Sequence, residues 1–339
     1  MGYFRLILAI LVCANHLWII GGVGRYAVFS FYILSGYLMT TIICTRYGVT
    51  RNGVIKYALN RVLRIYPTYL IVFLFTILAI SWIGGEHTKA IDPNISIPQG
   101  AINWIMNISL IGLDFNVINR TVPPSWTLFI ELFFYAFIPL AIKLGPRFII
   151  AWLIFSIAYH AHFFFEPYSI GYSWNERYGS LLAGSLGFAL GCSAKTILHN
   201  TLRFKNSLSL SIIGLIACYS IPTYYTLTGY NDSNWNFISS AGFYLNMIFS
   251  TIFISNIINH KQNAANKFLG ELSYPLYLCH LPVGFVVINT FNLVPRTIPS
   301  LIISLIFSIA ASLALYSVEK KINSIRDIIR PQEKTSIMQ

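Results

Sequence analysis

The stretch that decides the fold is PSWTLFIELFFYAFIPLAI, residues 124–142. It carries a single charge, at Glu131, in a run that is otherwise uncharged and mostly apolar. A helix needs about 20 such residues to cross the hydrocarbon core of a bilayer, so this run predicts a membrane-spanning helix. A carboxylate inside such a helix costs about 2.5–3.5 kcal/mol, and a chain that keeps one is usually using it. Glu131 is therefore a candidate functional residue.

Runs of the same kind recur along the chain of 339 residues, of which 56% are hydrophobic and only 10% are charged. In a soluble domain, about a quarter of the residues are charged. We therefore expect an all-α polytopic membrane protein with about ten transmembrane helices. The expected spans are 4–22, 26–45, 65–84, 125–143, 147–165, 178–195, 207–227, 238–258, 270–292 and 298–318.

The positive charges indicate how these spans are oriented. With the N-terminus in the cytoplasm, 18 of the 23 lysines and arginines fall on the inner side, which is the bias that membrane proteins show. We therefore expect both termini in the cytoplasm, with one transmembrane domain over 1–318 and a charged cytoplasmic tail over 319–339. The net charge of +12 then requires no nucleic-acid partner. The five cysteines are scattered singly, so neither a disulfide framework nor a metal site is expected.

Two segments interrupt the series of spans. Residues 46–66, between spans two and three, place basic residues on one face and apolar residues on the other. This pattern predicts a basic amphipathic helix that lies in the cytoplasmic interface and ends at Pro67. The second segment, residues 85–124, lies outside, and its apolar piece 101–113 is too short to span the membrane.

Arg5 and His16 share one face of the first span, because they are eleven positions apart, close to three helical turns. Their separation along the helix axis is about 16 Å, which places Arg5 at the cytoplasmic mouth and His16 deep, toward the outer half. Taken alone, Arg5 reads as an interface anchor and His16 as an interhelical hydrogen-bonding group. Together they indicate an anionic ligand at the mouth and a reacting group reached inside the membrane.

Glu131 lies on a polar stripe of its helix with Thr127 and Tyr135, one turn before and one turn after it. Counted from the outer end of the span, Glu131 lies about 9 Å deep, at a depth comparable to that of His16. A carboxylate paired with an imidazole would hold one tautomer and raise the basicity of the histidine. The alternative is that Glu131 pairs with a buried arginine or tyrosine.

Two further polar groups lie within predicted spans. Ser273, Tyr277 and His280 share a helical face, and His280 is either a second proton-transfer group or a structural hydrogen-bonding partner. Ser35-Gly36 in the second span indicates close helix packing. Ser35 as a nucleophile is the weaker interpretation, because a serine nucleophile needs a base beside it.

Taken in order, these fragments resemble the acyltransferase-3 family of bacterial integral-membrane O-acyltransferases, over nearly the whole chain. The pieces that carry the resemblance are Arg5 with ten residues before His16, residues 31–38, residues 61–67, residues 125–128 with Glu131 and Phe134-Tyr135, and residues 269–274 with Tyr277, Leu278 and His280. The family commonly carries a basic pair before the Arg61 position, whereas Asn60 precedes it here, a change expected to weaken donor binding.

The resemblance implies transfer of an acyl group, most often acetyl from acetyl-CoA, to a sugar hydroxyl of a cell-surface polysaccharide or of its lipid-linked precursor. It also implies a multi-pass protein of the bacterial inner (cytoplasmic) membrane, in contact with membrane lipids and needing no metal. By this resemblance, Arg5, Arg61 and Arg64 bind the phosphates of the acyl-CoA. His16 is then the general base or the transient acyl carrier, and Glu131 orients it or positions the sugar.

Substrate contacts are expected from a second set of residues in the same motifs: Ser35, Trp126, Tyr135, Tyr277 and His280.

Two other classes of protein fit part of the pattern. A transporter or exporter of acyl groups or lipid-linked sugars would also have many spans and buried polar residues, but we find no paired helices broken by glycine and proline in matching halves. A polysaccharide polymerase has no need of an inward-facing arginine cluster. The acyl group, the sugar and its hydroxyl, and the oligomeric state stay open.

Overall fold

The computed structural model describes residues 1–18, 20, 22–89, 91–165, 176–198, 207–229, 235–257 and 263–331. Within these ranges every regular element is a helix, and nine helical segments are long and apolar enough to cross a membrane. A shorter apolar helix, α1 (Gly2–Leu17), corresponds to the first expected span. The prediction of an all-α polytopic membrane protein is therefore confirmed.

In chain order the elements are α1 (Gly2–Leu17), α2 (Val23–Ile42), η1 (Ile43–Tyr47), α3 (Arg51–Ile83), α4 (Gly85–Lys89), α5 (Gly100–Ser109), η2 (Pro123–Ser125), α6 (Trp126–Leu144), α7 (Pro146–Phe165), α9 (Leu181–Ser193), η3 (Ala194–Leu198), α11 (Leu208–Thr228), α12 (Trp235–Ile257), α13 (Ala264–Thr290) and α14 (Ile298–Ile329).

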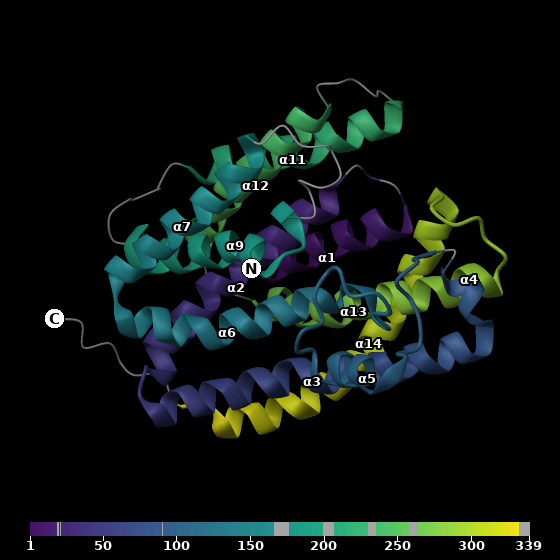
Figure 1. The fold of residues 1–339 in the computed structure, drawn as a ribbon, viewed down its shortest axis with the longest axis horizontal. Helices are drawn as coiled ribbons and strands as arrows, with labels where there is room; N and C mark the ends of the chain where they lie inside the picture. Colours follow the sequence, from purple (N-terminus) through teal and green to yellow (C-terminus); the bar gives the residue numbers. More distant parts are fainter. Residues whose placement is uncertain are drawn as a thin grey trace.

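Helices α2 and α13 organise the bundle (Figure 1). α2 packs against α1, α6, α9 and α12, whereas α13 packs against α1, α3 and α14. α1 contacts both α2 and α13, so it joins the two groups of helices. A pocket between α1, α2 and α13 is therefore lined by residues that lie far apart in the sequence.

Small residues allow the closest of these helix contacts. A Cβ atom on Gly191 of α9 would lie 2.1 Å from the backbone oxygen of Ile33 in α2. On the facing helix, a Cβ atom on Gly36 would lie 2.6 Å from the backbone oxygen of Phe188. Glycine at both positions lets the two backbones approach in a way that no other residue would allow. The close packing predicted at Ser35-Gly36 is confirmed.

Helix α3 differs from its prediction at Pro67. Residues 51–66 are helical as expected, and the Thr50 hydroxyl caps the helix by accepting a hydrogen bond of 3.2 Å from the Gly53 amide. The helix does not end at Pro67, however, and runs on to Ile83 as one element of 33 residues. Proline is tolerated inside membrane-spanning helices because neighbouring groups can satisfy the freed backbone. The basic segment is thus the first half of one continuous helix, and its position in the cytoplasmic interface stays a prediction.

The outer segment between α3 and α6 is attached to α3 by tyrosines. The hydroxyl groups of Tyr66 and Tyr69 donate to the backbone oxygens of Ser109 and Asn107, near the end of α5. With 10 residues, α5 is about 15 Å long, half the thickness of the hydrocarbon core. The prediction that the apolar piece 101–113 does not span is consistent with this length.

Helix α14 continues past the predicted start of the tail. It runs to Ile329, and Glu319 and Arg326 in this last part are buried. Residues 319–329 therefore belong to a packed helix. Residues 332–339 of the expected tail lie outside the described residues.

Candidate active site

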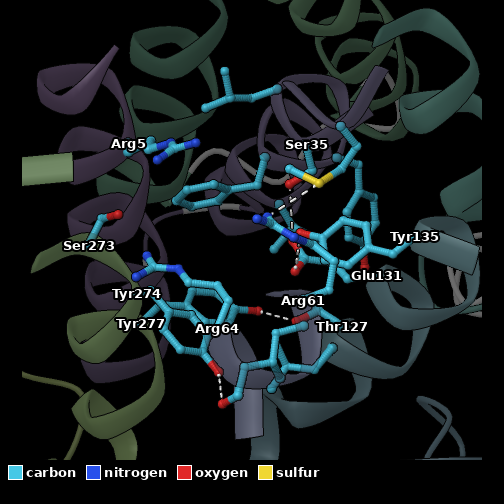
Figure 2. A pocket seen from close by; sticks show the side chains of 17 residues that line it. Arg5, Ser35, Arg61, Arg64, Thr127, Glu131, Tyr135, Ser273, Tyr274 and Tyr277 are labelled. Atoms are coloured by element: carbon cyan, nitrogen blue, oxygen red, sulfur yellow. Dashed lines mark hydrogen bonds between the residues drawn. The ribbon is translucent and has the colours of Figure 1, made fainter. Parts of the chain in front are cut away.

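A pocket of about 810 Å³, its open mouth included, lies between five helices of the bundle. Figure 2 shows that polar side chains from α1, α2, α3, α6 and α13 point into it. The lining residues are Arg5, Val28, Phe31, Tyr32, Leu34, Ser35, Met39, Arg61, Arg64, Ile65, Thr127, Leu128, Glu131, Tyr135, Ser273, Tyr274 and Tyr277. We call it the arginine pocket, because three guanidinium groups face one carboxylate there.

The three arginines predicted to bind the donor are brought together in this pocket. Arg5 comes from α1, whereas Arg61 and Arg64 lie one turn apart on α3. Arg64 Nη1 donates to Glu319 Oε2 over 2.8 Å, which offsets one positive charge. Arg61 Nη2 donates over 2.7 Å to Asn60 Oδ1, a neutral partner. Across the described ranges, no hydrogen bond or ion pair engages the Arg5 guanidinium.

The charge of the pocket therefore remains positive. No carboxylate forms an ion pair with Arg5 or Arg61 in the described residues, and Glu131 is the single carboxylate in the lining. Guanidinium groups bind phosphate and carboxylate oxygens through two parallel hydrogen bonds, so the pocket suits an anionic ligand with phosphate groups.

Glu131 lies in the arginine pocket and does not pair with His16, contrary to one expectation. Its Oε1 accepts from the Ser35 hydroxyl at 3.3 Å and its Oε2 from the Tyr135 hydroxyl at 3.0 Å. The pairing with tyrosine is the alternative left open by the sequence. Ser35 and Tyr135 thus lie in the pocket as predicted substrate-side residues, held by this carboxylate.

The predicted pairing failed because packing gives Glu131 and His16 other partners, Ser35 and Tyr135 for the carboxylate and His280 for the imidazole. The start of α6 is covered by the protein itself. Pro123, Pro124 and Ser125, which precede the helix, are all buried. Trp126 is buried too, and its ring packs at 5.0 Å against both Phe115 and Tyr178. Trp126, predicted to bind substrate, is not among the residues that line the pocket.

His16 pairs with the other predicted histidine instead. His16 Nδ1 lies 2.8 Å from His280 Nε2, and the two rings are nearly coplanar, with an angle of 4° between their planes. His280 Nδ1 lies 2.7 Å from the backbone oxygen of Tyr277. We call these two residues the histidine pair.

The Tyr277 carbonyl fixes the protons of the histidine pair. A carbonyl oxygen can only accept, so His280 Nδ1 carries a proton and His280 Nε2, in the neutral ring, does not. His280 Nε2 must then accept the hydrogen bond from His16 Nδ1. His16 is left with a free lone pair on Nε2, which is the form required of a base or nucleophile.

Tyr277 also connects the histidine pair to the arginine pocket. Its hydroxyl group lies 2.8 Å from the Thr127 hydroxyl, and both residues line the pocket. Its carbonyl holds His280, one turn further along α13. The histidine pair is therefore next to the arginine pocket without lining it.

A second pocket, of about 700 Å³ with its open mouth, reaches His16 from elsewhere. It is lined by Asn15, His16, Ile20, Gly22, Ile91, Asp92, Leu281 and Arg296. Residues 91 and 92 belong to the segment predicted to lie outside, so we call this the outer pocket. Its charged groups are one carboxylate and one guanidinium, in contrast to the arginine pocket.

Several residues at these pockets were not predicted as site residues: Asn15, Asn60, Asp92, Arg296 and Glu319. Asp92 and Arg296 lie at turns in connecting segments, where charged residues are ordinary. Glu319 directly follows the apolar part of the last span and therefore read as the start of a tail. In the described ranges, no group of three or more His, Cys, Asp or Glu side chains is placed to hold a metal ion.

The fold is that of a multi-pass membrane protein, and it encloses a positively charged pocket beside a histidine pair. The acyltransferase domain family matches residues 1–317, so the chain belongs to that family. The O-acetyltransferase OatA of Staphylococcus aureus, in strains NCTC 8325 / PS 47, COL and MRSA252, is 27% identical over 323 residues. These matches cover 85% of this chain and 50% of each relative, so the chain spans about half the length of the curated relatives it matches. No solved structure matches the chain significantly.

Proposed function

We propose that this protein is an O-acyltransferase of the bacterial inner membrane. It would move acetyl from cytoplasmic acetyl-CoA to a sugar hydroxyl of a cell-surface polysaccharide or of its lipid-linked precursor. One observation carries the proposal: Tyr277 contributes its hydroxyl to the arginine pocket and its carbonyl to the histidine pair. The family membership and the O-acetyltransferase activity for which the OatA relatives are named support it.

The arginine pocket is the donor site in this proposal. Arg5, Arg61 and Arg64 bind the phosphates of acetyl-CoA, for which fixed guanidinium groups are well suited. The pantetheine arm extends along α1 and carries the thioester toward His16. Ser35 and Glu131 lie along the pocket, where the carboxylate can accept a hydrogen bond from an amide of the arm.

The reaction takes place at Nε2 of His16. As the sugar hydroxyl oxygen attacks the thioester carbonyl, Nε2 accepts the hydroxyl proton, the carbon–sulfur bond breaks, and the proton passes to the thiolate of coenzyme A. His280 keeps its hydrogen bond to Nδ1 and so stabilises the imidazolium that forms. The same lone pair serves as the nucleophile if the acyl group is first carried on His16. Both routes need the tautomer that the Tyr277 carbonyl selects.

The outer pocket is the acceptor site in this proposal. Asn15 and Asp92 offer an amide and a carboxylate beside His16, and these groups exchange hydrogen bonds with sugar hydroxyls. The carboxylate of Asp92 offsets the charge of Arg296, so this pocket lacks the excess of guanidinium groups that would attract the polyanionic donor. The two substrates are thus sorted by charge before they meet at His16.

Turnover of acetyl-CoA by the purified protein in detergent tests the proposal. We expect the wild type to release free coenzyme A thiol, and His16→Ala to lose this release by about 10²–10⁴-fold, the usual contribution of a general base. Size-exclusion elution and thermal stability of the variant show whether it is folded. Equal release by both proteins would remove His16 from the reaction. A folded wild type that neither binds nor consumes acetyl-CoA would contradict the enzyme and favour a transporter.

A further inference from the structure

The last part of α14 lies behind the arginine pocket. Glu319 and Arg326 are only 3% and 6% exposed, and neither of them lines the pocket. Glu319 holds Arg64 with one carboxylate oxygen and accepts from the Thr68 hydroxyl, at 3.1 Å, with the other. Both residues follow the stretch that matches the acyltransferase family, which ends at residue 317.

Arg326 reaches the pocket through Asn60. Its Nε and Nη2 donate to Asn60 Oδ1 over 3.3 and 3.1 Å, and Asn60 Nδ2 donates to the Arg326 backbone oxygen over 3.3 Å. The same Oδ1 accepts the 2.7 Å hydrogen bond from Arg61 Nη2. Asn60 is fully buried, so one amide joins two guanidinium groups away from water.

We propose that Arg326 is a positioning residue for the donor site, acting through Asn60 on Arg61. It fixes the Asn60 amide, and the amide fixes the guanidinium of Arg61, whose Nη1 makes only a weak 3.4 Å contact to Met39 Sδ. Arg326 never touches the ligand. The inference rests on the proposed function, because the ligand of this site is there taken to be acyl-CoA.

The Asn60 side chain is neutral, and this determines how much positive charge Arg61 presents to the ligand. An amide oxygen orients Arg61 without cancelling its charge, so the guanidinium remains available to phosphate. An aspartate would accept the same hydrogen bonds but would neutralise one of the two arginines. The neutral acceptor at position 60 therefore serves both arginines of this chain without removing the charge of either.

Ligand affinity of the full chain, purified in detergent, tests this inference. We would measure the binding of coenzyme A and of inorganic pyrophosphate, together with KM and kcat for acetyl-CoA. Arg326→Gln and Asn60→Asp should each weaken the binding of both ligands by about tenfold or more, as expected for misplacing or neutralising a charged hydrogen-bond donor. The value of kcat at saturating donor should stay within about twofold, because neither residue reaches the thioester.

The matched control is Arg330→Gln. Arg330 lies one turn beyond Arg326 and forms an exposed ion pair of 2.9 Å with Asp327. The control removes the same charge from nearly the same place without touching Asn60, so its affinities should stay within about twofold of the wild type. If ligand binding is weakened equally in Arg326→Gln and Arg330→Gln, the loss of one positive charge explains the effect, and the positioning role is overturned. If Arg326→Gln does not fold, wild-type affinity in Asn60→Asp would overturn it.

The inference and the proposed function fail in different ways. Suppose that the wild type binds pyrophosphate and coenzyme A, that the two variants lose this binding, and that the wild type never consumes acetyl-CoA. This result would support the positioning role of Arg326 and contradict the proposed reaction. A wild type that turns over acetyl-CoA, with unchanged affinities in both variants, contradicts the positioning role alone.

Discussion

The tautomer of His16 is set by its hydrogen bond to His280, which lies 264 positions away in the chain. An imidazole acts as base or nucleophile only through a nitrogen with a free lone pair, and the partner of the other nitrogen decides which one that is. Here the Tyr277 carbonyl decides it, through His280. Spacing in the sequence drew attention to both histidines, but it could not show that they pair, because that contact depends on how α1 packs against α13.

The role of His280 predicts a difference between two substitutions. His280→Ala removes the acceptor for His16 Nδ1 and should lower kcat by about 10–100-fold, the usual cost of losing a partner that orients a histidine. His280→Gln should retain much more activity, since its amide oxygen can accept the same hydrogen bond. Steady-state kinetics check this, with KM for acetyl-CoA expected to be unchanged in both. Full activity in a folded His280→Ala protein would show that the pair is only structural.

The position of Arg5 in the arginine pocket predicts that removing its side chain lowers the affinity for the donor. Its guanidinium faces the arginine pocket without a hydrogen-bonded partner in the described residues. Arg5→Ala should therefore raise KM for acetyl-CoA by about tenfold while kcat changes little. Arg51→Ala is the control, because Arg51 is exposed at the start of α3. If KM rises equally in both variants, Arg5 is an anchor at the interface rather than part of the donor site.

At the scale of the element, the helices were easier to predict than their ends. Apolar runs of membrane length identified the spans, because lipid demands them. A local signal misled at one boundary, because Pro67 was predicted to end the helix and instead lies inside α3. The helix continues there beyond the point where the local sequence predicts a stop.

The close contact between α2 and α9 predicts that one added methyl group lowers the stability of the protein strongly. Gly191→Ala places a Cβ atom 2.1 Å from a backbone oxygen, which cannot move aside as a side chain would. We expect a loss of about 3 kcal/mol or more in stability, measured as a lower midpoint of thermal unfolding in detergent. Gly85→Ala is the control, since nothing lies within 4 Å of its Cβ position. Equal midpoints for both variants would contradict the packing described here.

For the molecule as a whole, the sequence predicted which residues line the arginine pocket better than it predicted which of them contact one another. Seven predicted site residues line that pocket: Arg5, Ser35, Arg61, Arg64, Glu131, Tyr135 and Tyr277. Charged and polar groups in membrane-spanning segments are costly, so they stand out in a sequence and gather in space. Which of them pair was not predictable, since pairing follows from how the helices pack, as the separate partners of Glu131 and His16 show.

The expected orientation in the membrane predicts a labelling pattern. Cys44 is exposed, whereas the other four cysteines are buried. With both termini in the cytoplasm, Cys44 should escape a membrane-impermeant thiol reagent in right-side-out vesicles and react in inside-out vesicles. A cysteine at Ile118, a side chain 70% exposed in the outer segment, should show the reverse. If Cys44 is labelled from outside, the expected orientation is inverted.

In the proposed function, the donor and the acceptor meet at His16 from opposite sides of the membrane. Inside-out vesicles that contain the protein and its glycan acceptor, supplied externally with radiolabelled acetyl-CoA, test this arrangement. We predict that label accumulates on glycan in the vesicle lumen with the wild type and is absent with His16→Ala, at equal protein levels. Lumenal label that is the same with both proteins, or that arises only from acetyl-CoA supplied inside the lumen, would contradict the account.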